Sequence, residues 1–221
     1  VLQNQARRDY GTSITFMTWI HELDIVRWAL DVNYPEHVSV TSGKFQYQDD
    51  GWEMYDTMMA TFRYAGNRTI QWDGRSRNGY DKYGAGRGTL IYGSEGSVFI
   101  DRDGYKLYDL KGKLIKKNVV SGLENGNTLG GGGGLTVAHT LNFFDAIRGK
   151  AQLTSPIEQG AISQTLTHYA NIASRIDESF EIDEKTGRIF NREAMKLWSR
   201  TYEPGWEIKP ILVNTNCFPR N

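Results

Sequence analysis

The chain has 221 residues, of which 39% are hydrophobic, enough for the core of one large domain or two small ones. Its 26 Lys and Arg balance its 26 Asp and Glu, and the resulting zero net charge argues against binding to nucleic acid or to an anionic membrane. One cysteine, Cys217, excludes an internal disulfide and a multi-cysteine metal cluster, and no apolar run approaches the roughly 20 residues of a membrane span. We therefore expect a soluble protein, with the cytoplasm and the periplasm both open as compartments.

The first predicted helix covers residues 19–30. Its apolar residues recur at the spacing of one buried helix face, namely at Trp19, Leu23, Val26 and Leu30. A different face of the same helix brings together His21, Asp24 and Trp28, because residues three, four and seven positions apart are neighbours on a helix.

From about residue 37 to residue 117, the apolar residues recur with the period of two that is typical of β-strands. Alternate positions from Met58 to Tyr64 are apolar or aromatic, which predicts one buried strand face. The connections are short, as at 65–67, 93–96 and 101–104, and turns of this length join antiparallel neighbours. The middle of the chain is therefore predicted to be an antiparallel sheet of about six or seven strands.

Helices are predicted again after residue 134. One carries Val137, Leu141, Phe144 and Ile147 and is closed by Gly149, the next begins with Ser155 as its N-cap, and the last covers residues 192–202. Strands in one block and helices mainly in another predict an α+β fold: a large open, mostly antiparallel sheet with helices packed on one face. If the other face of the sheet is apolar, it needs a partner surface.

Two glycine-rich segments lack the spacing of a nucleotide-binding loop. Residues 130–134 precede a helix, but they follow a loop instead of a buried strand, and no Lys-Ser or Lys-Thr follows them. Residues 84–88 fail the same test and precede a strand. We therefore predict no cofactor-binding residues in this chain. Metal ligands in paired spacing are also missing, so no metal site is predicted.

His21 is the strongest candidate for chemistry. A neutral imidazole with an ordinary pKa of about 6.5 suits proton transfer at physiological pH, and Asp24 on the same face can orient that imidazole or contact a ligand. The alternative is a histidine packed at a helix N-terminus with one backbone hydrogen bond. The spacing alone does not separate these two interpretations.

Two further candidates lie outside this helix. Tyr80 belongs to a polar connection between strands, which either contacts a sugar through aromatic faces and planar hydrogen-bonding groups, or is exposed to solvent, or faces a partner subunit. The other polar residues of this connection are Asp73, Arg75, Arg77, Asp81 and Arg87. His139 and Asn142 follow the second glycine segment on a helix, and they either hydrogen-bond a polyol or satisfy the loop that packs on them.

Several segments, in this order, resemble the C-terminal half of the glucose–fructose oxidoreductase/inositol dehydrogenase/MocA-like (Gfo/Idh/MocA) family. Residues 19–28 (WIHELDIVRW) are similar to the family's G-x-H-x-x-D helix, and residues 92–98 (YGSEGSV) to its G-t-x-G hairpin. Residues 139–148 (HTLNFFDAIR) are similar to its H-x-x-N-F-x-d-a-I-r helix, and residues 170–173 and 193–194 also fit.

The resemblance implies that residues 1–221 are a single domain of the dehydrogenase C-terminal type, which binds substrate and mediates oligomerisation. Relatives bind NAD or NADP in an N-terminal Rossmann domain that also supplies a catalytic lysine. That domain is absent from this chain, so we expect no cofactor for the chain alone. The resemblance also implies hydride transfer on a sugar or cyclitol, a sugar-like small molecule as partner, and a homo-oligomer formed through the open sheet face.

The family's catalytic pair is Asp-x-x-x-His, and its histidine aligns with His21, which implies a general acid/base role. Asp24, Tyr80 and His139 are then candidate substrate-binding residues. The position of the aspartate holds Met17, whose side chain can neither accept a proton nor orient a partner as a carboxylate does. The alternative is therefore a non-catalytic carbohydrate-binding or oligomerisation module derived from the family.

Overall fold

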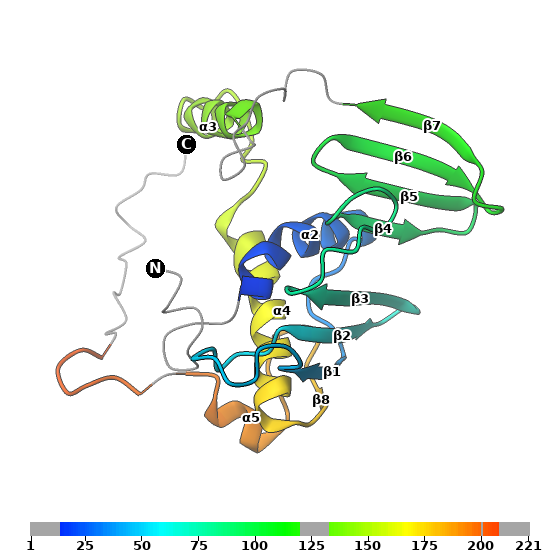
Figure 1. Ribbon diagram of the computed structural model, residues 1–221. Coiled ribbons are helices and arrows are strands. Elements are labelled where there is room, and N and C mark those ends of the chain that lie inside the picture. Colours follow the sequence, from blue (N-terminus) through cyan, green and yellow to red (C-terminus); the bar gives the residue numbers. More distant parts are fainter. Residues whose placement is uncertain (1–13, 120–132, 200, 208–221) are drawn as a thin grey trace.

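The computed structural model describes residues 14–119, 133–199 and 201–207, without the side chains of residues 14–18, 133 and 135. Strands occupy the middle of the chain and helices lie towards both ends (Figure 1). The helices are α2 (Ile14–Leu30), α3 (Gly133–Ile147), α4 (Ile157–Ile176) and α5 (Arg192–Lys196). The strands are β1 (His37–Gly43), β2 (Thr57–Tyr64), β3 (Arg68–Arg75), β4 (Thr89–Tyr92), β5 (Gly96–Asp101), β6 (Gly104–Asp109), β7 (Leu114–Val119) and β8 (Phe180–Glu181).

The described strands form two four-stranded sheets, in the orders β3-β2-β1-β8 and β4-β5-β6-β7. Every pair of neighbours is antiparallel. The predicted α+β class with open antiparallel sheets is therefore confirmed. The prediction of one continuous sheet is not, because the connection 76–88 is no tight turn and does not bring β4 into a hydrogen-bonded register with β3.

The core lies between the first sheet and the helices α2 and α4. Strand β2 buries Met58, Ala60, Phe62 and Tyr64 and so confirms the predicted face. Helix α2 adds Trp19 and Leu23, and helix α4 adds the apolar row Leu166, Tyr169 and Ala173. The Trp19 ring stacks on Trp72 of β3 at a centroid distance of 4.8 Å. Each large apolar side chain buried in this way stabilises the fold by about 1.5–3 kcal/mol.

Two helix boundaries differ from the predicted ones. Helix α4 has Pro156, not Ser155, as its N-cap, and the extended Pro156 backbone (φ −68°, ψ 150°) carries no side-chain cap. Ser155 thus stands one residue too early to cap the free amide groups. Helix α5 ends at Lys196, where a longer helix was predicted, and Trp198 beyond it stacks on Tyr169 at 5.9 Å.

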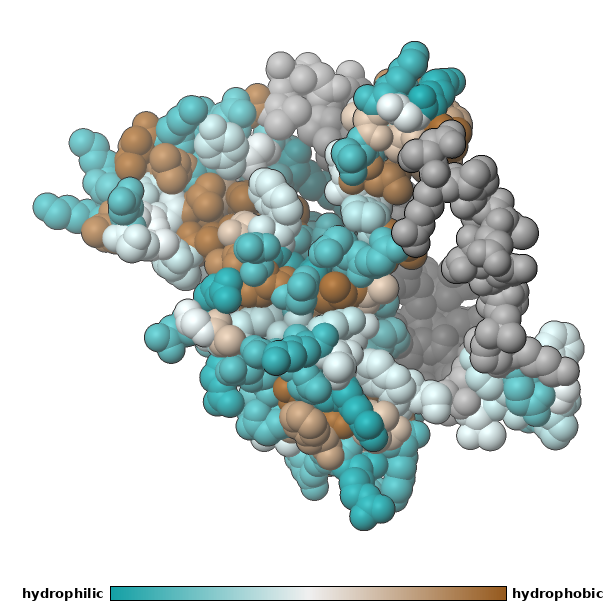
Figure 2. Space-filling model, turned by 180° about the vertical axis from the view of Figure 1, so that it is seen from behind, coloured by the Kyte–Doolittle hydropathy of each residue, from teal (hydrophilic) through white to brown (hydrophobic). Residues whose placement is uncertain are grey.

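The second sheet and α3 have little cover among the described residues. Every residue of β7 is exposed, and Phe99 is the buried hydrophobic residue of this sheet. Helix α3 lies away from the first sheet (Figure 1). The apolar residues that mark this helix, Val137, Leu141, Phe144 and Ile147, are exposed. Seen from behind, hydrophobic side chains gather over the second sheet and on α3 (Figure 2). Within the described parts of the chain, no helix is long and apolar enough to cross a membrane.

Candidate functional site on helix α2 and the neighbouring loops

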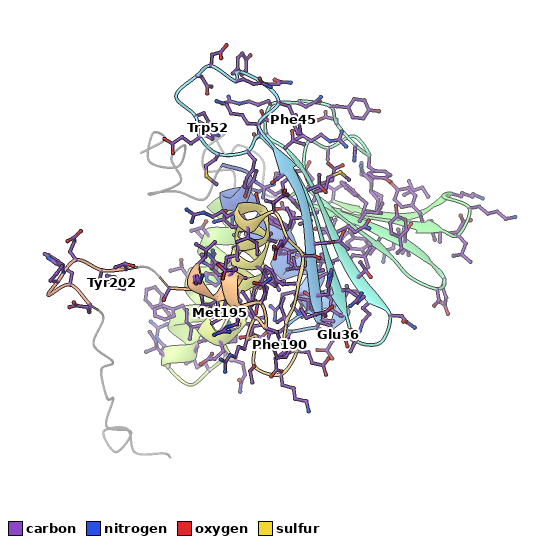
Figure 3. The ribbon with its side chains drawn as sticks, turned by 90° about the horizontal axis from the view of Figure 1, so that it is seen from below. Glu36, Phe45, Trp52, Phe190, Met195 and Tyr202 are labelled. Carbon is purple, nitrogen blue, oxygen red and sulfur yellow. The ribbon has the colours of Figure 1, made fainter. Side chains whose placement is uncertain are left out.

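The register of β1, β2 and β3 places the ends of these strands in one row at one end of the first sheet. Gly43 pairs with Thr57, and Thr57 pairs with Arg75, so the last residue of β1, the first of β2 and the last of β3 form one row. The loops 44–56 and 76–88 both begin at this row and therefore emerge from the same end of the sheet. Figure 3 shows Phe45 and Trp52 at this end and Glu36 at the other.

Helix α2 runs antiparallel to β3, which brings its first turns to the same end. At the far end, Arg68 Nη1 at the start of β3 donates a 3.0 Å hydrogen bond to the carbonyl of Leu30. Further along α2, Glu22 Oε1 accepts a 2.8 Å hydrogen bond from Nε of Arg87, which lies just before β4, and forms an ion pair with its Nη2 at 2.6 Å. His21, next to Glu22, lies near the middle of α2; Trp19, two residues before it, stacks on Trp72, so His21 lies alongside the middle of β3 and the first turns of α2 lie nearer the loops.

Asp56 holds the two loops together. Its carboxylate accepts hydrogen bonds from the amides of Phe45 (2.9 Å) and Gln46 (2.8 Å) and from the Thr57 hydroxyl (2.8 Å), and its carbonyl accepts one from the Ser76 amide (2.9 Å). Burial favours the protonated form of this carboxyl group. The donors from Gln46, Thr57 and Phe45 outweigh burial and hold the pKa of Asp56 below its ordinary value.

Lys44 closes the first loop from inside. Its Nζ contacts Asp50 Oδ1 at 2.7 Å and the carbonyl of Trp52 at 2.6 Å, and it also reaches the carbonyls of Gln48 and Asp50. The hydrogen bond from Lys44 lowers the pKa of Asp50. Lys44, the first residue after β1, therefore holds the middle of the loop 44–56 close to the end of that strand.

The two loops also meet through aromatic rings. The Arg77 guanidinium lies 5.5 Å from the centroid of the Tyr47 ring and 5.1 Å from that of the Trp52 ring. No described residue accepts a hydrogen bond from this guanidinium. Phe45 and Tyr47 are 64% and 67% exposed. We call Phe45, Tyr47, Trp52 and Arg77 the aromatic rim.

The predicted residues on α2 are placed as follows. The His21 imidazole is exposed. Asp24 is 49% exposed, and one of its oxygens accepts a 2.6 Å hydrogen bond from Ser163 on α4. Met17 lies outside the residues whose side chains are described. Glu22, which the sequence patterns did not single out, has a side chain only 15% exposed, and its Oε2 has no hydrogen-bond partner among the described residues.

Tyr80 and His139 lie on other elements. Tyr80 is 75% exposed in the connection 76–88, three residues after Arg77. His139 is exposed on α3, and its neighbour Asn142 binds the loop that follows, with the Gln152 carbonyl at 2.8 Å and the Thr154 amide at 3.0 Å. Asn142 thus takes the loop-supporting role that was the alternative to polyol binding. Among the described residues, no hydrogen bond or ion pair joins Tyr80 or His139 to His21 or Asp24.

A shallow pocket of 190 Å³ lies at the opposite end of α2 and holds none of the predicted site residues. Its lining is Asp31, Val32, Asn33, Tyr34, Tyr64, Ala65, Arg68 and Glu184. Among the described residues, no group of three or more His, Cys, Asp or Glu side chains could hold a metal ion. Of the glycine run 130–134, the first three residues lie outside the described part.

Three solved structures share this fold. An oxidoreductase from Agrobacterium radiobacter, in complex with NAD+, L-tartaric acid and magnesium, matches 74% of this chain and 47% of its own, with a TM-score of 0.54 and 12% identity. A protein from Klebsiella pneumoniae, assigned as an oxidoreductase by inference, matches 88% of this chain and 55% of its own, with a TM-score of 0.55 and 13% identity. A similarly assigned protein from Yersinia pestis matches 80% and 52%, with a TM-score of 0.54 and 17% identity.

At these identities, the likeness establishes the fold, and no protein-family model or curated protein sequence matches the chain. The chain spans about half the length of each of the three structures. It therefore has the fold of one part of these oxidoreductases: open antiparallel sheets with helices packed on them.

Proposed function

We propose that the chain is the substrate-binding and oligomerisation domain of an NAD(P)-dependent oxidoreductase that acts on a hydroxyl or carbonyl group of a sugar or cyclitol. The observation that carries this proposal is the likeness of 74–88% of the chain to about half of each of three oxidoreductases, one of them in complex with NAD+. The nicotinamide cofactor, NAD or NADP, belongs to a domain outside this chain and supplies hydride transfer when bound.

His21 is the general acid/base in this proposal. Removal of a hydride from a carbinol carbon leaves the hydroxyl proton to be taken up, and the exposed imidazole of His21 is the proposed acceptor of that proton. Asp24, Tyr80 and His139 are the proposed substrate contacts. Asp24 keeps one oxygen on Ser163, and the half-exposed remainder of its carboxylate is available to a ligand hydroxyl.

A second candidate function, a non-catalytic carbohydrate-binding or oligomerisation module, is favoured by one feature. Met17 stands where the resembled family has the aspartate of its catalytic pair, and Asp24, three positions beyond His21, already serves the packing of α2 on α4. A module of this kind retains sugar binding and self-association without a proton-transfer pair.

The test uses the protein as its native host produces it. Reduction of NAD+ and NADP+ is followed by absorbance with a panel of aldoses and cyclitols, for the unchanged protein and for His21→Ala. We expect turnover to fall about 10²- to 10⁴-fold, the range supplied by a positioned acid/base. His37→Ala is the matched control, because His37 begins β1 at the other end of the sheet.

Unchanged turnover in His21→Ala would contradict the acid/base role. If the unchanged protein reduces neither cofactor with any member of the panel, Met17→Asp separates the two candidates. A gain of activity supports the oxidoreductase, whereas continued inactivity together with measurable sugar binding supports the non-catalytic module.

A further inference from the structure

We propose that the aromatic rim is a subsite that stacks a closed, uncharged polyhydroxyl ring, such as a pyranose or a cyclitol, in preference to an open-chain polyol. This inference rests on the proposed function, because it assigns a surface that binds the ring of the same class of ligand. The rim lies at the end of the first sheet from which the loops 44–56 and 76–88 emerge, and α2 begins towards the same end.

The rim exposes apolar ring surface on a backbone that is held in place. Phe45 and Tyr47 are each about two-thirds exposed, yet their loop is anchored by the Asp56 carboxylate at one side and by Lys44 at the other. Because the loop is already ordered, a ligand that covers these rings does not have to order it. Exposed aromatic surface on a fixed loop favours a partner that offers a flat apolar face.

The position of the Phe45 ring depends on Gly43. A Cβ atom at position 43 would lie 2.5 Å from Phe45 Cζ, so the tip of the ring occupies the space that a side chain would fill. The ring is therefore held over the end of β1 instead of projecting freely. The substitution Gly43→Ala should therefore displace the Phe45 ring without removing it.

Arg77 provides the polar half of the subsite. Its guanidinium is fixed by the Tyr47 and Trp52 rings, and its N–H groups are directed along its edge, where no described residue accepts them. A sugar ring carries hydroxyl oxygens at its edge, which can accept hydrogen bonds from the Arg77 N–H groups. It also has a face of C–H groups, which can stack on the aromatic rings. Stacking and edge hydrogen bonds can then form together on one ligand.

The charges around the rim favour an uncharged ring over a carboxylated one. Lys44 pairs with Asp50, and Arg75 and Lys82 both pair with Asp73. Arg77 packs against the loop 44–56, which carries four carboxylates, Asp49, Asp50, Glu53 and Asp56, and one ammonium group, Lys44. The positive charge of Arg77 is thus already offset by carboxylates of the neighbouring loop.

A closed ring also fits better than an open chain on conformational grounds. A pyranose holds several C–H groups on one face without further ordering, whereas an open-chain polyol must freeze its rotatable bonds to present a comparable face. The rim therefore discriminates by shape, in addition to hydrogen bonding.

The test is saturation-transfer difference NMR and affinity measurement on the full chain with three probes: methyl β-D-glucopyranoside, methyl β-D-glucuronide and sorbitol. We expect the glucoside to bind, with the strongest saturation on the axial hydrogens that share one face of the pyranose. Sorbitol should bind at least about ten-fold more weakly, and the glucuronide no more tightly than the glucoside. Phe45→Ala and Gly43→Ala should each weaken glucoside binding about ten-fold, one by removing the ring and the other by displacing it.

Tyr92→Ala is the matched control, because Tyr92 is an exposed aromatic residue on β4 of the second sheet, and thermal unfolding verifies that each variant is folded. Glucoside binding that is unchanged in folded Phe45→Ala and Gly43→Ala overturns the subsite while leaving sugar binding in place. Equal binding of sorbitol, or tighter binding of the glucuronide, overturns the stated preference. If the glucoside does not bind the unchanged chain, the subsite is overturned, and reduction of NAD+ or NADP+ with the panel of aldoses and cyclitols decides separately whether the proposed function fails.

Discussion

The hydroxyl of Ser163 on α4 donates a 2.6 Å hydrogen bond to the carboxylate of Asp24 on α2 and accepts a 2.8 Å hydrogen bond from buried Arg27. Arg27 also reaches Gln159 and Asn33, and burial lowers its pKa. This network joins the helix that carries His21 to the helix that covers the first sheet. A residue predicted to bind substrate thus also fixes the position of its own helix.

Ser163→Ala is expected to lower the free energy of unfolding by about 1–3 kcal/mol, because it leaves the buried Arg27 without one acceptor and Asp24 without a donor. Urea unfolding followed by tryptophan fluorescence measures the change. Ser155→Ala is the control: Ser155 does not cap α4, so its removal should change the stability by less than about 0.5 kcal/mol. Equal effects of the two substitutions would contradict the network.

Sequence patterns correctly predicted the helices and strands that are determined by residues close together in the chain. The alternation from Met58 to Tyr64 and the turn at 65–67 depend on residues within one hairpin, and both are found. The apolar spacing of α2 likewise predicted the burial of Trp19 and Leu23. In each case the signal and the structure that it determines lie within one short segment.

The rest of the site depends on contacts between distant segments. Glu22 and Arg87 are 65 positions apart, and no periodicity connects them. The loop 44–56 carried a visible signal, a run of aromatic residues between two strands, but its meaning depends on Arg77 reaching over from the next loop. The apolar stripe of α3 predicted a helix correctly, yet the sequence alone did not indicate that its apolar residues would be exposed.

Asp56→Asn should destabilise the protein by about 1–3 kcal/mol at neutral pH, because an amide is uncharged and has one acceptor oxygen, so it cannot accept from Phe45 and Gln46 on one side and from Thr57 on the other as the carboxylate does. The substitution should also change the acid response. A carboxyl group whose pKa is lowered on folding stabilises the folded state above its unfolded pKa of about 3.9. That stabilisation is lost as the pH falls below this value and through the lowered folded pKa.

The free energy of unfolding should therefore fall less steeply with decreasing pH in Asp56→Asn than in the unchanged protein, below about pH 4. Urea unfolding at a series of pH values measures the two slopes. Asp103→Asn serves as control, since Asp103 is exposed in the turn between β5 and β6. Parallel pH profiles for the unchanged protein and Asp56→Asn would show that Asp56 is not the group responsible.

The ion pair between Glu22 and Arg87 links α2 to the start of the second sheet. Arg87→Met should cost about 1–3 kcal/mol, because it leaves the mostly buried Glu22 carboxylate without its partner. Glu22→Gln combined with Arg87→Met should cost less than the sum of the two single substitutions. A double-mutant cycle by urea unfolding measures this coupling, and strictly additive effects would exclude a stabilising pair.

The second sheet has little cover among the described residues, and this makes the oligomerisation proposal testable at one residue. Ile115 is an exposed hydrophobic residue on β7, in a strand whose every residue is exposed. If copies of the chain associate through this sheet, Ile115→Asp places a charge in an apolar contact, and burying a charge without a partner is strongly unfavourable. Light scattering coupled to size exclusion should then give a lower mass for Ile115→Asp than for the unchanged chain. Glu95→Gln in the β4–β5 turn is the control that should leave the mass unchanged, and an oligomer of undiminished mass in Ile115→Asp would place the interface elsewhere.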